Sequence, residues 1–463
     1  PEDTVCEALP PPRVYPDRAT GARRSALTLA AAALLAACGG GGGGSSAPAP
    51  TPAPPPAPAP ASCSAQVLTL GSCSYNAPVL TSGGSASLTT TTTGYTGSAT
   101  ASCTNGTVTL TATAASCQKS GPTDADLAIQ TQVPPLTYGV ESPERLFFEH
   151  LNTQRAQCGF GLLAQNTALD RAAKAHTDYI MERILEGTGN DFTAFQAYLA
   201  NPHIEIQGKS GFTGVSPFDR ASVTGYTTIG GLTESGAIPI FGVSTEGKTV
   251  GASGAGLSAG MGLLASVYHL RAMMGPYREA GVGQTFGLGA AARGTGTVSP
   301  TYMVLAYGQY PQTANTLRSY PCQGSTNVEF DMGGEIPNPY VGTPLFGTAV
   351  GHPIYFTAPR SATRIQIESI SIEPINAPAG TASYSLAAGT VHLVTQANDP
   401  HKRLKATDVF AVATTPMRRS TSYRVQGRVL IDSTAQNVDF TFATGIGYNN
   451  AAQDPKYLIP APK

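Results

Sequence analysis

The stretch SVYHLRAMMGPYREAGVGQ, residues 266–284, places His269 two residues before Arg271 on a short run with helical spacing. The chain has seven histidines and no tryptophan, so each imidazole is a scarce group. An imidazole can exchange a proton near neutral pH or bind a metal ion. A helix that only packed into a core would not need this pair. His269 and Arg271 are therefore candidate site residues, and the question is what His269 faces.

A second pattern with chemical meaning is Gly256-Leu257-Ser258-Ala259-Gly260, which fits the G-x-S-x-G nucleophile elbow. That elbow requires a buried strand before the serine and a helix after it. The preceding TVGASGA is too short and too rich in glycine for such a strand. We therefore interpret the match as accidental, and we expect residues 230–262 and 281–298 to form glycine-rich loops at the rim of a groove.

Apolar periodicity predicts the elements that position these residues. Ser142 before Pro143 is typical of a helix start, and PERLFFEHLNTQRAQ continues that helix. A second helix, NTALDRAAKAHTDYIMERI, places His176 on its buried face, where we expect a core histidine with satisfied ring nitrogens. TYMVLAYGQY, residues 301–310, predicts a buried strand. The helix around His269 turns three apolar side chains inward: Val267, Leu270 and Met274.

The N-terminal region predicts export. Arg23 and Arg24 precede SALTLAAAALLAAC, and an apolar run of about a dozen residues is typical of a signal peptide and too short to span a bilayer. Its end resembles the bacterial lipobox, in which the cysteine, here Cys38, is acylated. Residues 21–38 therefore predict a lipoprotein signal, and Gly39 favours the outer membrane. The alternative is an ordinary signal peptide with a chance cysteine.

Composition limits the organisation and the partners. The 463 residues suggest two or three domains. A net charge of −1 with 12% charged residues leaves no basic field, so nucleic acid is not an expected partner. Residues 39–62, rich in Gly and Pro, form a linker that holds the folded part away from the lipid.

Six cysteines remain when Cys6 and Cys38 are set aside, and an even number behind a secretory signal indicates disulfides. Residues 63–118 contain four of them in Thr-rich, β-prone sequence with an Asn105-Gly106 turn, which predicts a small disulfide β module. A disordered stalk is the alternative. Cys158 and Cys322 would close a domain of residues 135–322. The four cysteines of the module allow three pairings, all left open: Cys63, Cys73, Cys103 and Cys117.

Residues 323–450 change to a period of two, as in SYRVQGRVLIDS and NVDFTFATG. In RIQIESISIEPI the phase slips between Ile367 and Ile370, as at a β-bulge. Short strands between Pro, Gly and Asn turns predict a β-sandwich. Three histidines of this region have no metal-binding spacing and are interpreted as surface or structural residues: His352, His392 and His401.

The order of several motifs resembles bacterial members of the CAP superfamily, the cysteine-rich secretory, antigen and pathogenesis-related (SCP-like) proteins. The motifs are LNTQRAQCGFGLLAQNTALDRAAKAHTDYI, NPHIEI, FDRASVTGY, GLTESGA, YHLRAMMGPYREAGVGQ and YMVLAYG. The resemblance implies a multidomain chain whose central α+β domain is an α-β-α sandwich with a three-stranded antiparallel sheet and a groove. It also implies an Ig-like module after that domain.

The family's groove gathers two histidines and two acids. The resemblance matches His203 and His269 to the histidines and Glu234 to the acid of the Gly-Glu-Asn motif, although the flanking Gly and Asn are Thr and Ser in this chain. Arg271 lies one residue later than the family's arginine.

The second acid has no clear counterpart in the sequence, and Glu205 and Glu246 are its candidates. His203, His269 and Glu234 would suit a zinc ion with an open fourth position. The alternative is a hydrogen-bonded cluster that orders the groove.

Two functions follow as expectations. The favoured one is a lipid-anchored protein of the bacterial cell envelope, periplasmic or surface-exposed, whose groove binds a lipid, glycan or peptidoglycan-type ligand. Ligand binding is favoured because it is the most general property of the family. The alternative is a metal-assisted hydrolase that acts on envelope peptide or glycan.

Overall fold

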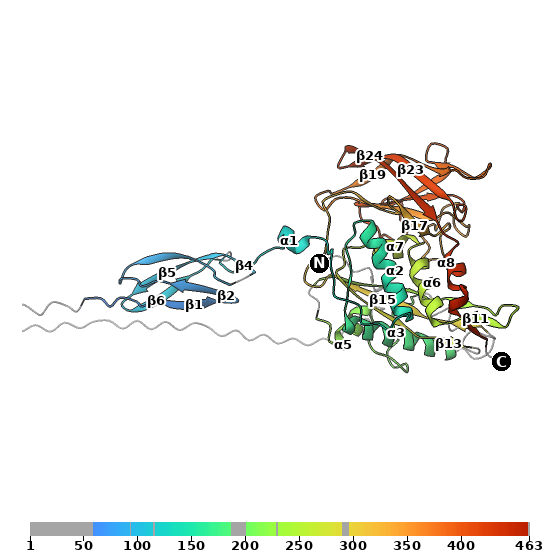
Figure 1. The fold of residues 1–463 in the computed structure, drawn as a ribbon. Helices are drawn as coiled ribbons and strands as arrows, with labels where there is room; N and C mark the ends of the chain where they lie inside the picture. Colours follow the sequence, from blue (N-terminus) through green and yellow to red (C-terminus); the bar gives the residue numbers. More distant parts are fainter. Residues whose placement is uncertain are drawn as a thin grey trace, which may run out of the picture. The chain divides into compact units, whose positions relative to one another are not determined.

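The computed structural model describes residues 59–92, 94–113, 116–186, 201–227, 230–288 and 296–461. The predicted signal at 21–38, with Cys38, and most of the linker lie outside the described residues. The chain is multidomain, with mixed helices and strands in several sheets. It divides into two compact units, with the boundary in the chain between residues 121 and 122; their elements are drawn in Figure 1.

The first unit is a small β module with two disulfides. Asn105 and Gly106, both with positive φ, connect β5 to β6 as a two-residue hairpin turn. The structure selects one of the three pairings that the sequence left open, Cys63–Cys103 and Cys73–Cys117. Its strands are β1 (Gln66–Leu70), β2 (Cys73–Ala77), β3 (Ser85–Thr89), β4 (Tyr95–Thr96), β5 (Ser98–Thr104), β6 (Thr107–Thr111) and β7 (Gln118–Lys119).

The second unit contains a central four-stranded sheet in the order β8-β12-β15-β9. Its three longer strands are antiparallel, and the short β8 adds a parallel fourth strand that the resemblance did not imply. The predicted strand after residue 300 is confirmed as β15, all of whose residues are buried. The strands are β8 (Ala164–Gln165), β12 (Glu279–Gln284), β15 (Thr301–Ala306) and β9 (Leu232–Ala237).

Helices pack on both faces of this sheet. On one face, Val304 and Ala306 contact α3, and on the other, Met303 and Leu305 join a core that includes α2 and α7. The Ser142 cap is confirmed, because its side chain accepts a hydrogen bond from the N–H of Arg145. The helices are α1 (Asp124–Leu127), α2 (Pro143–Gln157), α3 (Thr167–Glu186), α5 (Pro217–Val223), α6 (Ala252–Leu263), α7 (Val267–Met273), α8 (Tyr448–Ala452) and the 3-10 turn η2 (Pro455–Tyr457).

The glycine-rich segments are not mainly loops, which corrects the expectation for residues 230–262 and 281–298. Residues 252–263 form α6, and Gly281 and Gly283 of β12 lie directly under the backbone of α3, where a Cβ would collide with it. Glycine here permits close helix–sheet packing. Ser258 lies within α6 and is buried, so it has no nucleophile-elbow geometry.

The C-terminal part contains two facing sheets, in the orders β16-β18-β22-β21 and β17-β24-β23-β19-β20, with a shared apolar core. The predicted bulge is confirmed as a register shift between Ile367 and Ser369. The strands are β16 (Arg318–Tyr320), β17 (Ser325–Val328), β18 (Pro353–Thr357), β19 (Ile365–Ile375), β20 (Tyr384–Ser385), β21 (Val391–Thr395), β22 (Asp408–Ala413), β23 (Ser422–Ile431) and β24 (Thr434–Thr444).

These two parts of the second unit share one core. Tyr355 and Phe410, on the outer face of the first sheet, pack with residues of α2 and α7. The predicted Cys158–Cys322 disulfide is confirmed.

After the last long strand the chain returns to the helices of the central sheet, where α8 lies beside α6 (Figure 1). The remaining short strands are β10 (Ile240–Phe241), β11 (Lys248–Val250), β13 (Gly287–Leu288), β14 (Thr297–Val298) and β25 (Leu458–Pro460), and β11 pairs with β25.

Glu329 is a buried acid that directly follows β17 and contacts the first residue of α8. Its Oε2 accepts a hydrogen bond of 2.9 Å from the N–H of Tyr448, whereas its buried Oε1 has no hydrogen-bond partner among the described residues. Burial raises the pKa of this carboxyl to about 7, and the hydrogen bond from Tyr448 only partly opposes the increase.

Stability should therefore depend on pH through Glu329. Between its ordinary pKa of 4.5 and the folded value of about 7, the folded protein holds a proton that the unfolded chain has released. The resulting stabilisation is complete below the lower value and is lost as pH rises through the higher one. The free energy of unfolding of Glu329→Gln, relative to that of the parent, should therefore increase by up to about 3 kcal/mol between pH 4 and pH 8. Urea denaturation of both proteins at both pH values measures this. The same difference between variant and parent at pH 4 and at pH 8 would contradict the prediction.

Candidate functional site

A cavity of about 460 Å³, called the groove below, lies between the end of β9 and helices α6 and α7. His203, His269 and Tyr302 contribute to its wall, and much of the remaining lining is apolar, including Ile238 and Leu263. Residues from the C-terminal part also line it, namely Gly333, Gly334, Ile336, Tyr448 and Asn449. Residues 135–322 alone therefore do not complete the groove.

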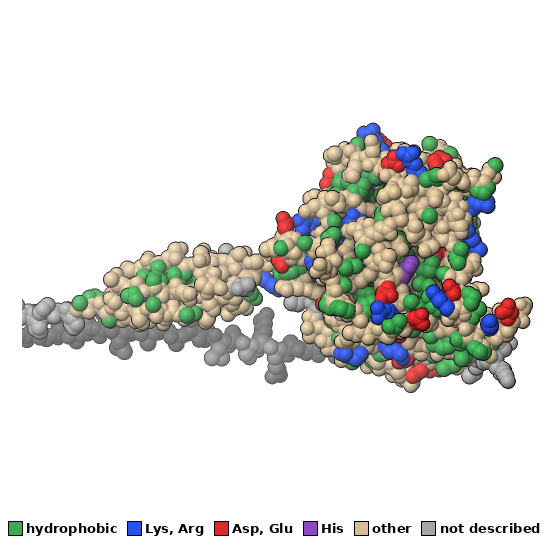
Figure 2. Space-filling model, in the orientation of Figure 1, with side chains coloured by type: hydrophobic (Ala, Val, Ile, Leu, Met, Phe, Trp, Pro, Cys, Tyr) green, Lys and Arg blue, Asp and Glu red, His purple; other side chains and the backbone are tan. Residues whose placement is uncertain are grey.

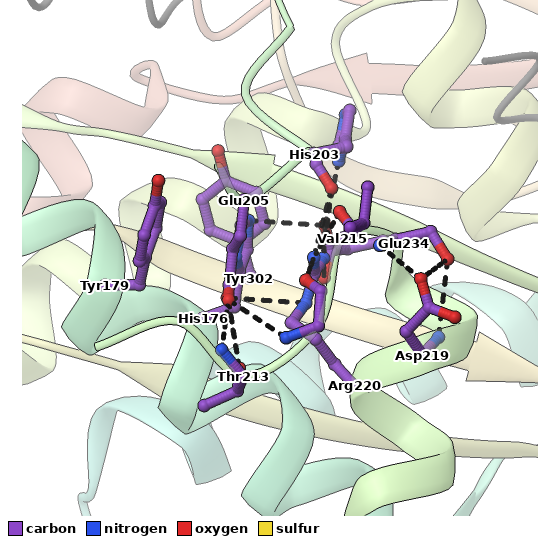
Figure 3. A network of polar contacts seen from close by, with 12 residues as sticks. His176, Tyr179, His203, Glu205, Thr213, Val215, Asp219, Arg220, Glu234 and Tyr302 are labelled. Carbon is purple, nitrogen blue, oxygen red and sulfur yellow. Dashed lines mark hydrogen bonds and ion pairs between the residues drawn. The ribbon is translucent and has the colours of Figure 1, made fainter. Parts of the chain in front are cut away.

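His203 is held in the groove wall by a buried ion pair behind it. Nδ1 of His203 lies 3.0 Å from Oε2 of Glu234, and since a carboxylate only accepts, the imidazole donates. One terminal nitrogen of Arg220 lies 2.8 and 2.9 Å from the two oxygens of Glu234. Arg220 also donates to the carbonyl oxygen of His203, so the arginine holds both the acid and the backbone of the histidine (Figure 3).

His176 and Glu205 extend this cluster into the core. Nδ1 of His176 lies 2.9 Å from Oε1 of Glu205, and Nε2 lies 3.0 Å from the carbonyl oxygen of Pro202. Both partners are oxygen atoms of acceptor groups, so the ring is fixed between a carboxylate and a backbone carbonyl. His176 is thus a satisfied core histidine, as expected, but one bond goes to a carboxylate. Arg220 lies close to both acids of the cluster, at 2.8 Å from Oε1 of Glu234 and 3.8 Å from Oε1 of Glu205, and Figure 3 shows these side chains side by side.

The electrostatics of the cluster set the protonation of the groove wall. Burial on its own would raise the pKa of Glu234, but Arg220, His176 and the hydrogen bond from His203 together lower it well below its ordinary value. Burial lowers the pKa of His203, and the opposing effect of Glu234 does not cancel it. At neutral pH His203 is therefore a neutral imidazole that donates from Nδ1, which leaves Nε2 as a hydrogen-bond acceptor.

His269 is positioned by an acid that the sequence did not indicate. Nδ1 of His269 lies 2.9 Å from Oε1 of Glu335 and 3.0 Å from Oγ of Ser266. Glu335 also accepts from the N–H groups that begin α7, those of Val267, Tyr268 and His269, at 2.8 to 2.9 Å. It is buried, and it lies beyond the predicted boundary at residue 322, in a segment with no strand or helix pattern.

The structure does not place the two acids proposed for this role in the groove. Glu205 is buried with His176 and also accepts from the N–H groups of Thr213 and Gly214, so it braces the loop that carries His203. Glu246 is 73% exposed and pairs with Lys248 on the surface. No local sequence pattern marks Glu335, whereas the Arg in FDRASVTGY could have indicated Arg220.

Arg271 lies outside the groove, which corrects its assignment as a groove residue. Its Nε lies 2.6 Å from Oδ2 of Asp408, and it lines a different cavity. The physical reason is the helical period, because residues two apart on α7 do not share a face. His269 and Arg271 therefore serve different sites.

The predicted metal set of His203, Glu234 and His269 is not formed. No group of three or more His, Cys, Asp and Glu side chains in the described ranges is placed to hold a metal ion. Glu234 already neutralises Arg220 and accepts from His203, so its oxygens are not available as a third ligand. The arrangement corresponds instead to the expected alternative, a hydrogen-bonded cluster that orders the groove.

Comparison of the chain with protein-family models, with curated proteins and with solved structures found no match in any of the three. Within the described part of the chain, no helix is long and apolar enough to cross a membrane. Basic and acidic side chains are interspersed over the face drawn in Figure 2, without a large area of one charge.

Proposed function

We propose that this chain is a lipid-anchored envelope protein with a CAP-like domain, and that its groove binds an amphipathic molecule carrying a hydroxyl group. The mixed sheet with helices on both faces supports the CAP assignment. So does the position of His203 and His269 on one groove with Glu234 behind them, in the order of the family's motifs. Two features depart from the family, since Glu335 serves as the second acid and Arg271 lies elsewhere.

The composition of the groove is the observation that carries this proposal. Ile240 and Ile336 line it with about half of their surface exposed, and Ile238 and Leu263 extend the apolar wall inward. Exposed aliphatic side chains around a cavity indicate a site for an apolar ligand. At its polar side, neutral His203 offers Nε2 as an acceptor, which suits a hydroxyl donor.

The envelope location rests on the sequence. The Arg-led apolar run ending at Cys38 supports a lipid anchor, and three disulfides in the folded part support an oxidising compartment. An anchored protein next to a membrane would meet amphipathic molecules at high local concentration.

Binding of a dansyl-labelled fatty alcohol to the soluble folded part, followed by fluorescence, tests the groove. A charge at the rim should exclude the apolar chain, so Ile240→Asp with Ile336→Asp is expected to weaken binding at least about tenfold. Val140→Asp is the matched control, because Val140 is 83% exposed and does not line the groove. It should bind as the parent does.

The negative outcomes are distinct. A parent protein that binds no fatty alcohol but is retained on purified cell-wall sacculi would move the assignment to a glycan or peptidoglycan ligand. A parent that does neither would refute binding at the groove. Equal binding by the double variant and Val140→Asp would place the alcohol outside it.

A further inference from the structure

A second cavity, of about 270 Å³, lies on the opposite side of α7 from the groove. Its wall combines the end of α7 and the segment after it with strands β16, β18 and β22 of the C-terminal part. Tyrosine and threonine hydroxyls contribute to the lining, among them those of Tyr355 and Thr357. We call this cavity the basic pocket because of its charges.

Four basic side chains and one acidic side chain are among the described residues that line the basic pocket: Arg271, Arg318, Arg360, Lys405 and Asp408. The acid is fully engaged, since Asp408 accepts from Arg271 at 2.6 Å and from the hydroxyl of Tyr355 at 2.7 Å. Arg360 pairs with Asp124, whose side chain is 91% exposed, and an ion pair with so exposed a partner is weak. The pocket therefore contains an excess of positive charge.

Arg318 is the unusual member of this set. Its guanidinium lies over the ring of Phe160 at 4.7 Å, and its buried Nε has no hydrogen-bond partner among the described residues. Arg318 forms no ion pair with any other residue that the structure describes. Arg155 lies near Arg318. Burial lowers the pKa of the Arg155 guanidinium, and repulsion from Arg318 lowers it further. Arg155 is a second cation that donates only to carbonyl oxygens, so it brings no acid near Arg318.

Asp408, which is already paired with Arg271, only partly offsets the burial of the Arg318 guanidinium. Such a charge is costly, and it persists where a ligand supplies the missing negative charge. The planar donors of arginine match the oxygens of a carboxylate or a phosphate. A cavity of about 270 Å³ is larger than a bare inorganic ion requires and is near the lower end of small-molecule sites. We propose that the basic pocket binds a small organic oxyanion, a phosphorylated or carboxylated molecule with hydroxyl groups, through Arg318.

Isothermal titration calorimetry of the folded chain with glycerol phosphate, glucuronate and inorganic phosphate, each at matched ionic strength, tests this proposal. At least one organic anion is expected to bind at least tenfold more tightly than inorganic phosphate. Arg318→Gln should weaken that binding at least tenfold. Arg318→Lys keeps the positive charge but loses the planar pair of guanidinium donors, so it should weaken binding less. Arg428→Gln is the matched control, because Arg428 is half-exposed on β23 and pairs with Glu368 at 2.9 Å.

Thermal unfolding shows whether the variants fold. Arg318→Gln should be at least as stable as the parent without ligand, because it removes an unpaired buried charge, and it should lose the ligand-induced increase in Tm. No binding of any of the three probes would overturn the proposal, and so would equal affinity in Arg318→Gln. Inorganic phosphate binding as tightly as both organic anions would overturn the assignment to an organic ligand. The result is independent of the groove, since Ile240→Asp with Ile336→Asp should bind the anion normally.

Discussion

Replacement of Arg220 by methionine is expected to destabilise the protein by about 3 to 5 kcal/mol, the usual cost of leaving a buried charge uncompensated. Arg220 and Glu234 are both buried, and both oxygens of the acid are within 2.9 Å of the guanidinium. The aliphatic part of methionine fills much of the arginine volume, so the loss reports mainly on charge. Urea denaturation at pH 7 measures it.

The matched control is Arg424→Met. Arg424 forms a two-pronged pair with Asp439 at 2.8 and 2.6 Å, but both side chains are half-exposed. Removing such a surface pair should cost far less than removing the buried pair, because water and salt screen exposed charges. Similar losses in Arg220→Met and Arg424→Met would mean that the buried pair does not hold the groove wall together.

Replacement of Glu335 by alanine is expected to cost about 2 to 4 kcal/mol and to weaken ligand binding in the groove. The change leaves three N–H groups at the start of α7 without their acceptor and releases Nδ1 of His269. Glu335→Gln keeps one carbonyl oxygen and should lose about half as much. Denaturation gives the stability, and fatty-alcohol fluorescence gives the affinity.

A structural role alone would lower stability without changing affinity under conditions where both variants are folded. The assignment of Glu335 as a positioning residue for His269 therefore requires a weaker affinity in folded Glu335→Ala. Glu335→Gln should recover part of that affinity. If folded Glu335→Ala binds the alcohol as the parent does, Glu335 only caps the helix.

Much of the secondary structure could be predicted because its determinants are local. The Ser142 cap, the burial of His176 on its helix and the bulge after Ile367 depend on residues a few positions apart. The position of Arg271 away from His269 is also a local property, because residues two apart on a helix lie on different faces. The glycine-rich segments were misinterpreted because glycine serves both loops and close packing.

The groove was only partly predictable. His203 and Glu234 were indicated by the order of motifs, and the structure brings them within 3.0 Å. Glu335 was missed because it lies 66 residues from His269, in a segment without periodic pattern. The metal set was predicted from the family resemblance together with the residue types, neither of which reveals that Arg220 already neutralises Glu234.

The sequence by itself determined many of the helices and strands, though not α6, and it predicts an exported lipoprotein. Only the tertiary structure decided the cysteine pairing of the small module, the acid behind His269 and the unpaired state of Arg318. The physical reason is the distance along the chain between the residues that interact. Helix and strand patterns arise from neighbours along the chain, whereas charge balance and burial depend on residues that only the folded chain brings together.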